Sequence, residues 1–256
     1  MKAMAKVRIG ATSDIHGFLE RLEDEIHAAD LDILVIAGDI HPCRIDVNAD
    51  TWFHKKFFPF VKALKIPVIV TPGNHDFWLA NYLSQERYDE SVKQEHNIPK
   101  NFHLLCDEYI LCHGVLFYGT PWVPWINGKW CFECSDETLK YHFSNIPKKT
   151  DVLITHTPPQ INHQYIDISK DHQVQYWRHF GSKALTQAIK TKQPKVNFCG
   201  HIHSGDHKCV SIKCDTAKGD EEVFCDCYNV SRVNEKYQVT YPIKVINYDA
   251  SELVFK

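Results

Sequence analysis

Short apolar runs alternate with amphipathic stretches through the first 70 residues of this 256-residue chain. Runs typical of buried strands lie at 7–12, 33–37 and 67–70. Between them, apolar positions recur with helical spacing near 18–29 and 49–64. This alternation predicts a βαβαβ unit, and therefore a parallel sheet at the start of the chain.

The pattern changes after residue 100. Alternating short runs in 102–120, around Cys112, His113 and Gly114, predict a β-hairpin, and a helix is predicted near 183–190. Strand-like runs follow at 152–155, 196–199, 209–214, 223–228 and 243–247, the last three resembling antiparallel strands. No repeat or Gly/Ser linker marks a boundary, so we expect 1–256 to form a single mixed α/β domain with two packed sheets.

Composition and charge narrow the class of protein. Hydrophobic residues make up 44% of the chain, enough for a sizeable core. Lys and Arg total 29 against 32 for Asp and Glu, and no basic run is present, which argues against binding many nucleic-acid phosphates. The first residues resemble no signal peptide, and no window approaches a membrane span. We therefore expect a soluble cytoplasmic protein.

Ten cysteines raise the question of disulfides. Disulfide scaffolds are usually short secreted chains, so we expect reduced thiols here. Cys131 and Cys134 form a CxxC, and Cys225 and Cys227 a CxC, which leaves a structural zinc site as the alternative to ordinary buried or surface thiols.

Polar residues follow the predicted strands at the points where those strands should end. They are Asp14 and His16 after the first strand, Asp39 after the second, Asn74, His75 and Asp76 after the third, His156 after 152–155, and His201 and His203 after 196–199. Loops at the carboxyl ends of sheet strands converge, so we expect these side chains to meet. Each of these residues alone is a weak signal, since a single His or Gly-Asp is usually a surface or turn residue. The ordered set of all of them predicts one site.

The residue types suit a particular chemistry. Imidazole nitrogens and carboxylate oxygens favour borderline divalent metals such as Mn, Fe, Co, Ni or Zn, and these loops contain no thiolate. An Asp can bridge two ions with its two oxygens. Glycines just before Asp39, Asn74 and His201 permit tight turns at the strand ends.

The ordered blocks D-x-H, G-D, G-N-H-D, H and G-H-x-H, from Asp14 to His203, resemble those of the calcineurin-like metallophosphoesterase family. The resemblance implies two packed sheets flanked by helices and a centre of two metal ions. One ion would be held by Asp14, His16, Asp39 and His203, and the other by Asp39, Asn74, His156 and His201. Asp39 would bridge, His75 would face the scissile phosphate, and Asp76 would orient the ring of His75.

A closer resemblance is to the branch related to class III cyclic-nucleotide phosphodiesterases and brain-type metallophosphoesterase-domain proteins. It rests on Gly-Thr-Pro-Trp at 119–122, Thr-His-Thr-Pro-Pro at 155–159, and the segments 179–182 and 228–231. The chain departs from that branch at Ser204-Gly205, where Glu-Gly is frequent, and in the polar insertion that follows through 222. It lacks the phosphate-binding Arg of protein Ser/Thr phosphatases, since Cys43 stands there, and the Tyr ligand of purple acid phosphatases.

Charge favours a diester substrate. Two divalent ions would contribute a charge of about +4, Asp14 and Asp39 together about −2, and a bridging hydroxide about −1. The net charge of about +1 would match the single negative charge of a diester. In the implied reaction the hydroxide attacks phosphorus and His75 protonates or stabilises the leaving oxygen.

A small phosphodiester or nucleotide is the expected substrate. The segment with Trp122, Pro124, Trp125 and Trp130 could stack a nucleobase, although a rigid loop that caps the core explains the same residues; His41 is a further candidate contact. A phosphomonoesterase, a nuclease on the same site and a catalytically silent binding protein are the alternatives.

Overall fold

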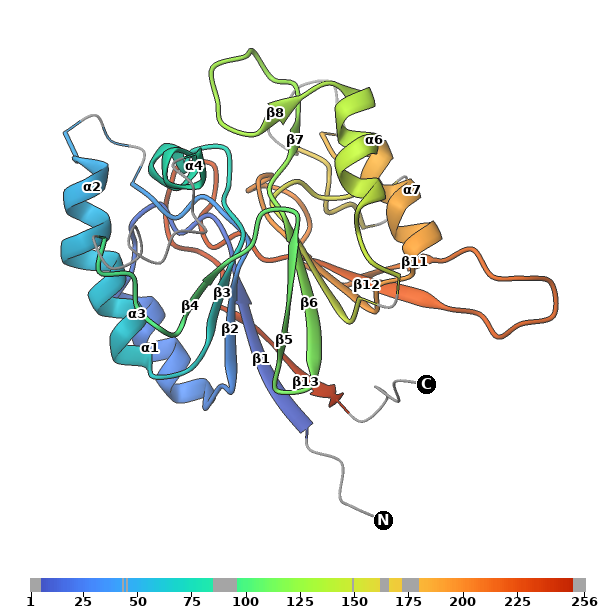
Figure 1. Ribbon diagram of the computed structural model, residues 1–256, viewed down its shortest axis with the longest axis horizontal. Helices are drawn as coiled ribbons and strands as arrows, with labels where there is room; N and C mark the ends of the chain where they lie inside the picture. The colour runs from blue at the N-terminus through green and yellow to red at the C-terminus, as the bar shows by residue number, and fades with distance from the viewer. Residues whose placement is uncertain are drawn as a thin grey trace.

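Two β-sheets form the centre of the molecule and face each other (Figure 1). A computed structural model describes residues 6–42, 44, 46–84, 96–148, 150–161, 166–171 and 180–250. Cys43 and His179, which entered the resemblance above, lie outside these residues. The first sheet contains, in spatial order, β13 (Lys244–Asp249), β1 (Lys6–Thr12), β2 (Ile33–Ile36), β3 (Val68–Val70) and β4 (Phe102–Leu104).

The second sheet has six strands. In spatial order they are β11 (Val210–Lys213), β12 (Phe224–Asn229), β10 (Val196–Cys199), β9 (Val152–Thr155), β6 (Val115–Thr120) and β5 (Glu108–Cys112). A small parallel pair, β7 (Val123–Pro124) and β8 (Glu133–Cys134), lies in the segment that follows β6.

Helices cover the outer face of each sheet (Figure 1). On the side of the first sheet lie α1 (Glu20–Ala29), α2 (Ala49–Trp52), the π-helical turn η1 (Phe53–Phe57), α3 (Phe58–Leu64) and α4 (Phe77–Ser84). On the side of the second lie α6 (Asp136–Ser144) and α7 (Lys183–Lys192). The predicted fold class, a mixed α/β sandwich of two packed sheets flanked by helices, is confirmed.

The burial of β2 shows how the sequence specifies these layers. All four residues are buried; Ile33 and Val35 pack between the sheets, whereas Leu34 and Ile36 pack against the outer helices. The sequence of a strand that is covered on both faces is a continuous apolar run, and the position of β2 could therefore be predicted.

Strand direction agrees with the prediction in part. β1 to β4 run parallel, as the opening pattern predicted. The predicted hairpin begins only at Glu108, because β4 pairs with β3 in the first sheet and the chain then crosses to the second. β11 and β12 are antiparallel to each other, but β12 runs parallel to β10, its other neighbour.

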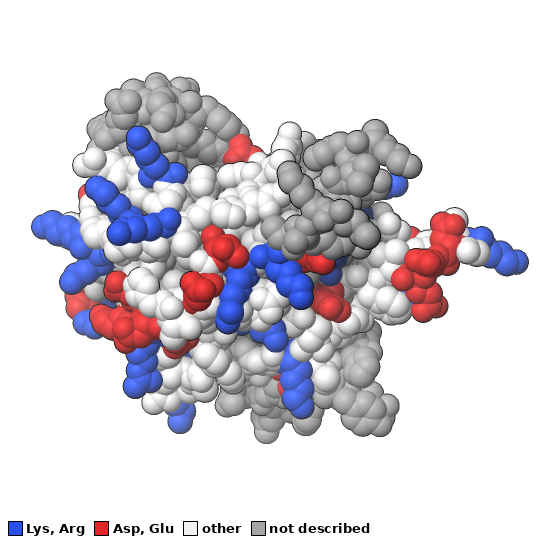
Figure 2. Space-filling model, turned by 90° about the horizontal axis from the view of Figure 1, so that it is seen from below, with Lys and Arg blue, Asp and Glu red and all other residues white. Residues whose placement is uncertain are grey.

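Two surface properties bear on partners. Within the described ranges, no helix is long and apolar enough to cross a membrane. Basic and acidic side chains are interspersed over the face seen from below in Figure 2, so this face carries no broad basic band.

Candidate metal centre

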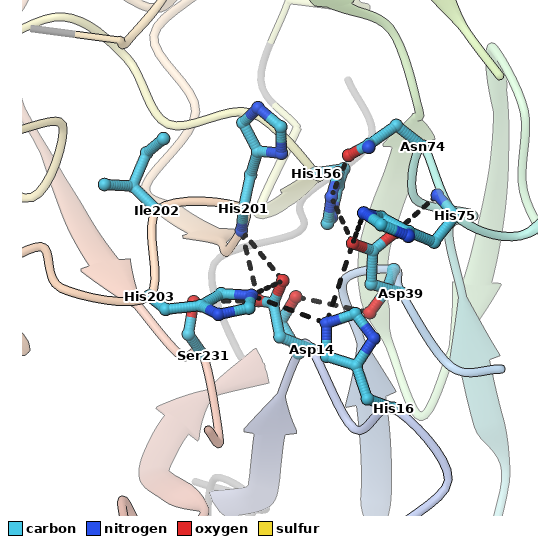
Figure 3. Close-up of polar contacts among 12 residues, drawn as sticks. Asp14, His16, Asp39, Asn74, His75, His156, His201, Ile202, His203 and Ser231 are labelled. Atoms are coloured by element: carbon cyan, nitrogen blue, oxygen red, sulfur yellow. Dashed lines mark hydrogen bonds and ion pairs between the residues drawn. The ribbon is translucent and has the colours of Figure 1, made fainter. Parts of the chain in front are cut away.

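The predicted ligands gather where parallel strands of both sheets end (Figure 3). β1, β2 and β3 lead into Asp14, Asp39 and Asn74, whereas β9 and β10 lead into histidines only. Those histidines are His156, His201 and His203. Asp14 and His156 are fully buried, and Asp39 and Asn74 are 2% exposed, so most of these polar groups are removed from bulk water.

Four of these residues have left-handed backbone conformations. The φ angles are 50° at Asp14, 45° at His16, 54° at Asp39 and 71° at His201. Each such conformation costs about 1–3 kcal/mol for a residue with a side chain, and persists only where the surroundings fix it. The Asp14 N–H donates to the Gly38 carbonyl and the His16 N–H to the Asp39 carbonyl. The loops therefore hold each other in place.

The glycines before the ligands have two different roles. Gly38 has a φ of 95°, as a tight turn requires. At Gly73 and Gly200, space is the requirement instead: an added Cβ would lie 2.1 Å from an oxygen of Asp39 and 2.3 Å from an oxygen of Asp14, respectively. Turns are present at these two glycines as well, since the Gly73 carbonyl accepts from the N–H of Asp76 and the Gly200 carbonyl from the N–H of Ile202.

One cluster of donors consists of Asp14, His16 and His203. The Nε2 atom of His203 lies 3.1 Å from Oδ1 of Asp14 and 3.4 Å from Nε2 of His16. All three residues are buried.

A second cluster lies beside the first and contains Asp39, His156 and again Asp14. The Nε2 atom of His156 is 3.4 Å from Oδ2 of Asp39 and 3.0 Å from Oδ1 of Asn74. The same Oδ2 of Asp39 is 3.9 Å from Nε2 of His16. Asp39 is thus within 3.9 Å of a histidine nitrogen of each cluster, while Asp14 is the residue that the two groups have in common.

His201 contributes to the site in a different way. Its N–H donates to both oxygens of Asp14, at 3.1 and 3.3 Å. Its ring lies edge-on to that of His156, with centroids 5.0 Å apart. It is thus next to the second cluster, although among the described residues it belongs to neither group of three closely spaced donors.

Outer hydrogen bonds orient the ligands. The hydroxyl of Ser231 donates to Oδ2 of Asp14 at 2.7 Å, and Nδ1 of His156 lies 2.8 Å from the carbonyl oxygen of Ala37. With Nδ1 donating its proton to that carbonyl, Nε2 of His156 presents a lone pair toward Asp39. Sequence reasoning used Ser231 only as part of the 228–231 motif and assigned it no contact with the site.

Burial and neighbouring charges shift the pKa values in opposite directions. Burial alone would raise the pKa of Asp14 and Asp39, but the surrounding imidazoles hold both carboxyls well below their usual range. Burial lowers the pKa of His16 to about 4, and burial together with His156 lowers that of His201 to about 3. Burial disfavours protonated His156 too, but Asp39 and Asp14 raise its pKa to about 9. The ionised carboxylates and the neutral imidazoles of His16 and His201 offer donors that fit borderline divalent cations, and a bound cation would have to displace the proton that Asp39 and Asp14 hold on His156.

His75 lies at the edge of the second cluster. Its N–H donates to Oδ1 of Asp39, and its Nε2 is 3.9 Å from Oδ2 of that residue. The side chain is 17% exposed, and the ring lies against Trp130 with centroids 4.2 Å apart. His75 is therefore accessible from outside while facing the ligands.

Asp76 has a role that differs from the prediction. Its Oδ1 accepts from the N–H groups of Ile40 and His41, and its Oδ2 from that of Gly73. Both oxygens thus accept from backbone groups, and among the hydrogen bonds of the described residues none joins this carboxylate to the ring of His75. Burial, then Asp39, raise its pKa to about 7. Asp76 joins the second and third ligand loops, a role that the sequence did not predict.

The predicted substrate contacts lie in several environments. The indole N–H of Trp122 donates to Asp107, and its ring stacks on His142 at 3.8 Å, as expected of the rigid-loop alternative. Trp125 is 64% exposed. The ring of His41 stacks against Phe53 at 6.1 Å and also contacts Trp52. Of the four predicted aromatic-wall residues, Trp130 is the one seen in contact with a site residue.

Other possible metal donors lie outside this centre. Asp50, His54 and His96 form a third group near α2, and Asp50 also accepts from the indole of Trp78. None of the three groups found among the described residues contains a cysteine, so the zinc alternative gains no support from them. The nine described cysteines are free thiols.

Comparisons with known proteins agree with this geometry. The model of the calcineurin-like phosphoesterase family matches residues 7–205. Metallophosphoesterase domain-containing protein 1 of Homo sapiens is 28% identical over 68% of this chain and 55% of its own length. A UPF0046 protein of Caenorhabditis elegans is 30% identical over 68% of this chain and 46% of its own.

The chain thus spans about half the length of these two relatives. A solved crystal structure covers 95% of the chain with a TM-score of 0.62 at 18% identity, which agrees with the fold. The similarity to metallophosphoesterase domain-containing protein 1 confirms the brain-type branch predicted from the sequence motifs.

Proposed function

Because this chain belongs to the calcineurin-like phosphoesterase family, we propose that it is a dinuclear metal-dependent phosphoesterase that prefers phosphodiesters. The observation that carries the proposal is the position of Asp39. Its Oδ2 atom lies 3.9 Å from Nε2 of His16 in one donor cluster and 3.4 Å from Nε2 of His156 in the other. A carboxylate between two clusters of nitrogen and oxygen donors is the arrangement that a pair of ions requires.

The proposed ligand sets extend the two clusters according to the family resemblance. One ion would be held by Asp14, His16, Asp39 and His203, and the other by Asp39, Asn74, His156 and His201. Manganese, iron, zinc, cobalt and nickel all suit these donors. When bound, such a pair of ions acidifies water and neutralises phosphate oxygens.

Hydrogen bonds within the protein fix the residues that would hold the ions. Asp14 is fixed by the hydroxyl of Ser231 and the N–H of His201, and Asp76 ties together the loops that carry Asp39 and Asn74. These bonds fix the site before substrate arrives, which lowers the reorganisation needed during the reaction.

His75 is the candidate proton donor for the leaving oxygen. It is partly exposed, lies on the side of the site near Trp130, and contacts Asp39 through its backbone N–H. A histidine in this position can protonate a strongly basic alkoxide as the ester bond breaks.

The preference for a diester rests on charge. A monoester dianion usually recruits an additional arginine. Arg44 is exposed and bonded to Asp46, and Arg232 is buried and bonded to Glu25, so both of these guanidinium groups have carboxylate partners. A diester with one negative charge matches the expected charge of the loaded centre, which is about +1.

The test compares matched substrates on the purified, manganese-loaded protein. We expect a higher kcat/KM for bis(p-nitrophenyl) phosphate than for p-nitrophenyl phosphate at neutral pH, and no turnover of either after chelation. A monoester preference would contradict the diester proposal. Cleavage of single-stranded DNA or RNA would favour the nuclease alternative, and absence of turnover with two ions bound would favour the silent binding protein.

A further inference from the structure

Tyr237 lies against two of the proposed metal ligands, although it is 34 residues beyond the last of them in the sequence. Its ring centroid is 4.8 Å from that of His16 and 5.5 Å from that of His203, with interplanar angles of 72° and 88°. The residue is 43% exposed. One part of the ring therefore packs on the ligands, while another part faces solvent at the same end of the sheets.

A well-defined turn fixes the position of this ring. The N–H of Tyr237 donates to the carbonyl of Asn234, and the side-chain oxygen of Asn234 accepts from the N–H groups of Lys236 and Gln238. Tyr237 itself has a φ of 54°, an uncommon conformation for a bulky residue. The ring is thus placed by its backbone.

The turn is attached to the ligand loops at two points. Glu235 accepts a hydrogen bond from the N–H of Ser204, directly after His203. At the base of the turn, the N–H of Arg232 donates to the carbonyl of Ser13, directly before Asp14. Movement of the turn would therefore disturb the loops on both sides of the first donor cluster.

Aromatic rings continue from Tyr237 across the site. His16 also contacts His75, with centroids 5.4 Å apart, and His75 contacts Trp130. Trp130 in turn lies 6.2 Å from Phe77, which is 46% exposed. The metal ligands are thus bordered by aromatic side chains at two ends, one end formed by Tyr237 and the other by Trp130.

We propose that Tyr237 contacts the organic group of the substrate and, with Trp130, selects esters that carry an aromatic ring such as an aryl group or a nucleobase. This inference rests on the proposed function, which places the ester phosphate beside the ligands. The organic groups of an ester held there must extend over the bordering side chains. Loss of a contact between a base and an aromatic side chain weakens binding by about tenfold.

The experiment measures binding without turnover. Phenylphosphonate and methylphosphonate keep their P–C bonds, and their affinities for the manganese-loaded protein can be compared by isothermal titration calorimetry. We expect the wild-type protein to bind phenylphosphonate more tightly than methylphosphonate. Tyr237→Ala should weaken phenylphosphonate binding about tenfold and leave methylphosphonate binding unchanged. Tyr237→Phe, which keeps the ring, should resemble the wild type.

Control measurements distinguish contact between Tyr237 and the ligand from effects of the substitution on folding and from binding of a metal ion by Tyr237. Tyr109→Ala removes a tyrosine that is 67% exposed on β5 and should change neither affinity. Metal content and Tm should be unchanged in Tyr237→Ala. In the iron(III)-loaded protein, a visible charge-transfer band that disappears in Tyr237→Phe would show phenolate ligation and overturn the proposal.

The outcomes distinguish this inference from the proposed function. Equal weakening of both phosphonates in Tyr237→Ala, or weakening of neither, would overturn the role of Tyr237 while leaving the phosphoesterase proposal standing. A Tyr237→Phe variant that behaves like Tyr237→Ala would show that the hydroxyl acts rather than the ring. Failure of the wild-type protein to bind either phosphonate would overturn this inference, whereas the proposed function would be overturned by absence of diester hydrolysis.

Discussion

The two sheets contribute different chemistry to the same site. The strands of the first sheet lead into both carboxylates and the amide, Asp14, Asp39 and Asn74, whereas β9 and β10 of the second lead into imidazoles. Two of the contacts that cross between the sheets pair a carboxylate with an imidazole: His203 lies 3.1 Å from Asp14, and His156 lies 3.4 Å from Asp39.

This difference has a physical consequence. Two buried carboxylates on the first sheet would repel each other without positive or polar partners, and the second sheet supplies those partners. Neither half holds a complete donor set. The centre therefore depends on the packing of the sheets, and changes to ligands on either sheet should impair it.

The largest effect is expected at Asp39, the residue between the clusters. Asp39→Ala should reduce turnover to background and remove at least one bound metal ion, because both proposed ligand sets lose an oxygen donor. Elemental analysis and diester hydrolysis measure the two effects. Asp220→Ala, an exposed change in the β11–β12 connection, is the control and should behave as wild type. Normal turnover with two ions retained in Asp39→Ala would contradict the bridging role.

His75 tests whether the first sheet also supplies the proton donor. His75→Ala should lower kcat/KM on a nucleotide diester by roughly a hundredfold to ten-thousandfold, since the alkoxide leaving group needs a proton. The loss should be clearly smaller on a nitrophenyl diester. Exposed His27 provides the matched control as His27→Ala. Equal losses on both substrates would assign His75 to binding the phosphate charge instead.

The side chains of Arg232 and Glu25 connect the segment after β12 to helix α1, which covers the first sheet. Arg232, in the segment after β12, is fully buried and forms two hydrogen bonds with Glu25 on α1. Glu25→Ala should lower the free energy of unfolding by about 2–3 kcal/mol, because it leaves a buried guanidinium without its carboxylate, while the 30% exposure of Glu25 moderates the loss. Glu23→Ala on the same helix should cost under about 0.5 kcal/mol. Denaturant titration measures the free energy of unfolding of both variants. Similar losses in Glu25→Ala and Glu23→Ala would contradict a stabilising role for the pair of Arg232 and Glu25.

The same pair predicts a pH dependence. Hydrogen bonding to Arg232 lowers the pKa of Glu25 below its ordinary value of 4.5. The stabilisation is therefore present above pH 4.5 and is lost as pH falls toward the lower folded value. The stability difference between wild type and Glu25→Gln should shrink over this acid range.

The smallest effect is expected at Ser231, an outer residue from the second sheet. Ser231→Ala removes the 2.7 Å hydrogen bond to Asp14 and should weaken metal affinity about tenfold without unfolding the protein. Ser84→Ala, at an exposed position on α4, is the control. Unchanged affinity would show that the N–H of His201 is sufficient to orient Asp14.

Much of the centre could be predicted because its ligands directly follow strands. The apolar run of β2 ends just before Gly38 and Asp39, so the position of the carboxylate followed from the end of the run. The same reasoning placed His156 after β9. Local sequence carries such information because strand, turn and ligand are adjacent.

The features that could not be predicted from the sequence depend on long-range packing, or on short sequence signals that are easily overlooked. Tyr237 and Ser231 reach the site only because the chain returns to it after β12, and no local pattern reports that return. Helix α6 was overlooked, although Ser135 caps it by accepting from the N–H of Thr138 and two acidic residues follow. The role of Asp76 depends on three backbone N–H groups that sequence cannot display.

Metal stoichiometry tests the central claim most directly. Elemental analysis of wild-type protein, saturated with manganese and freed of excess metal, should give two equivalents per chain. His16→Ala and His156→Ala, one from each cluster and each sheet, should each retain about one. A wild-type plateau at a single equivalent, or two equivalents retained in both variants, would contradict a dinuclear centre built from the two sheets.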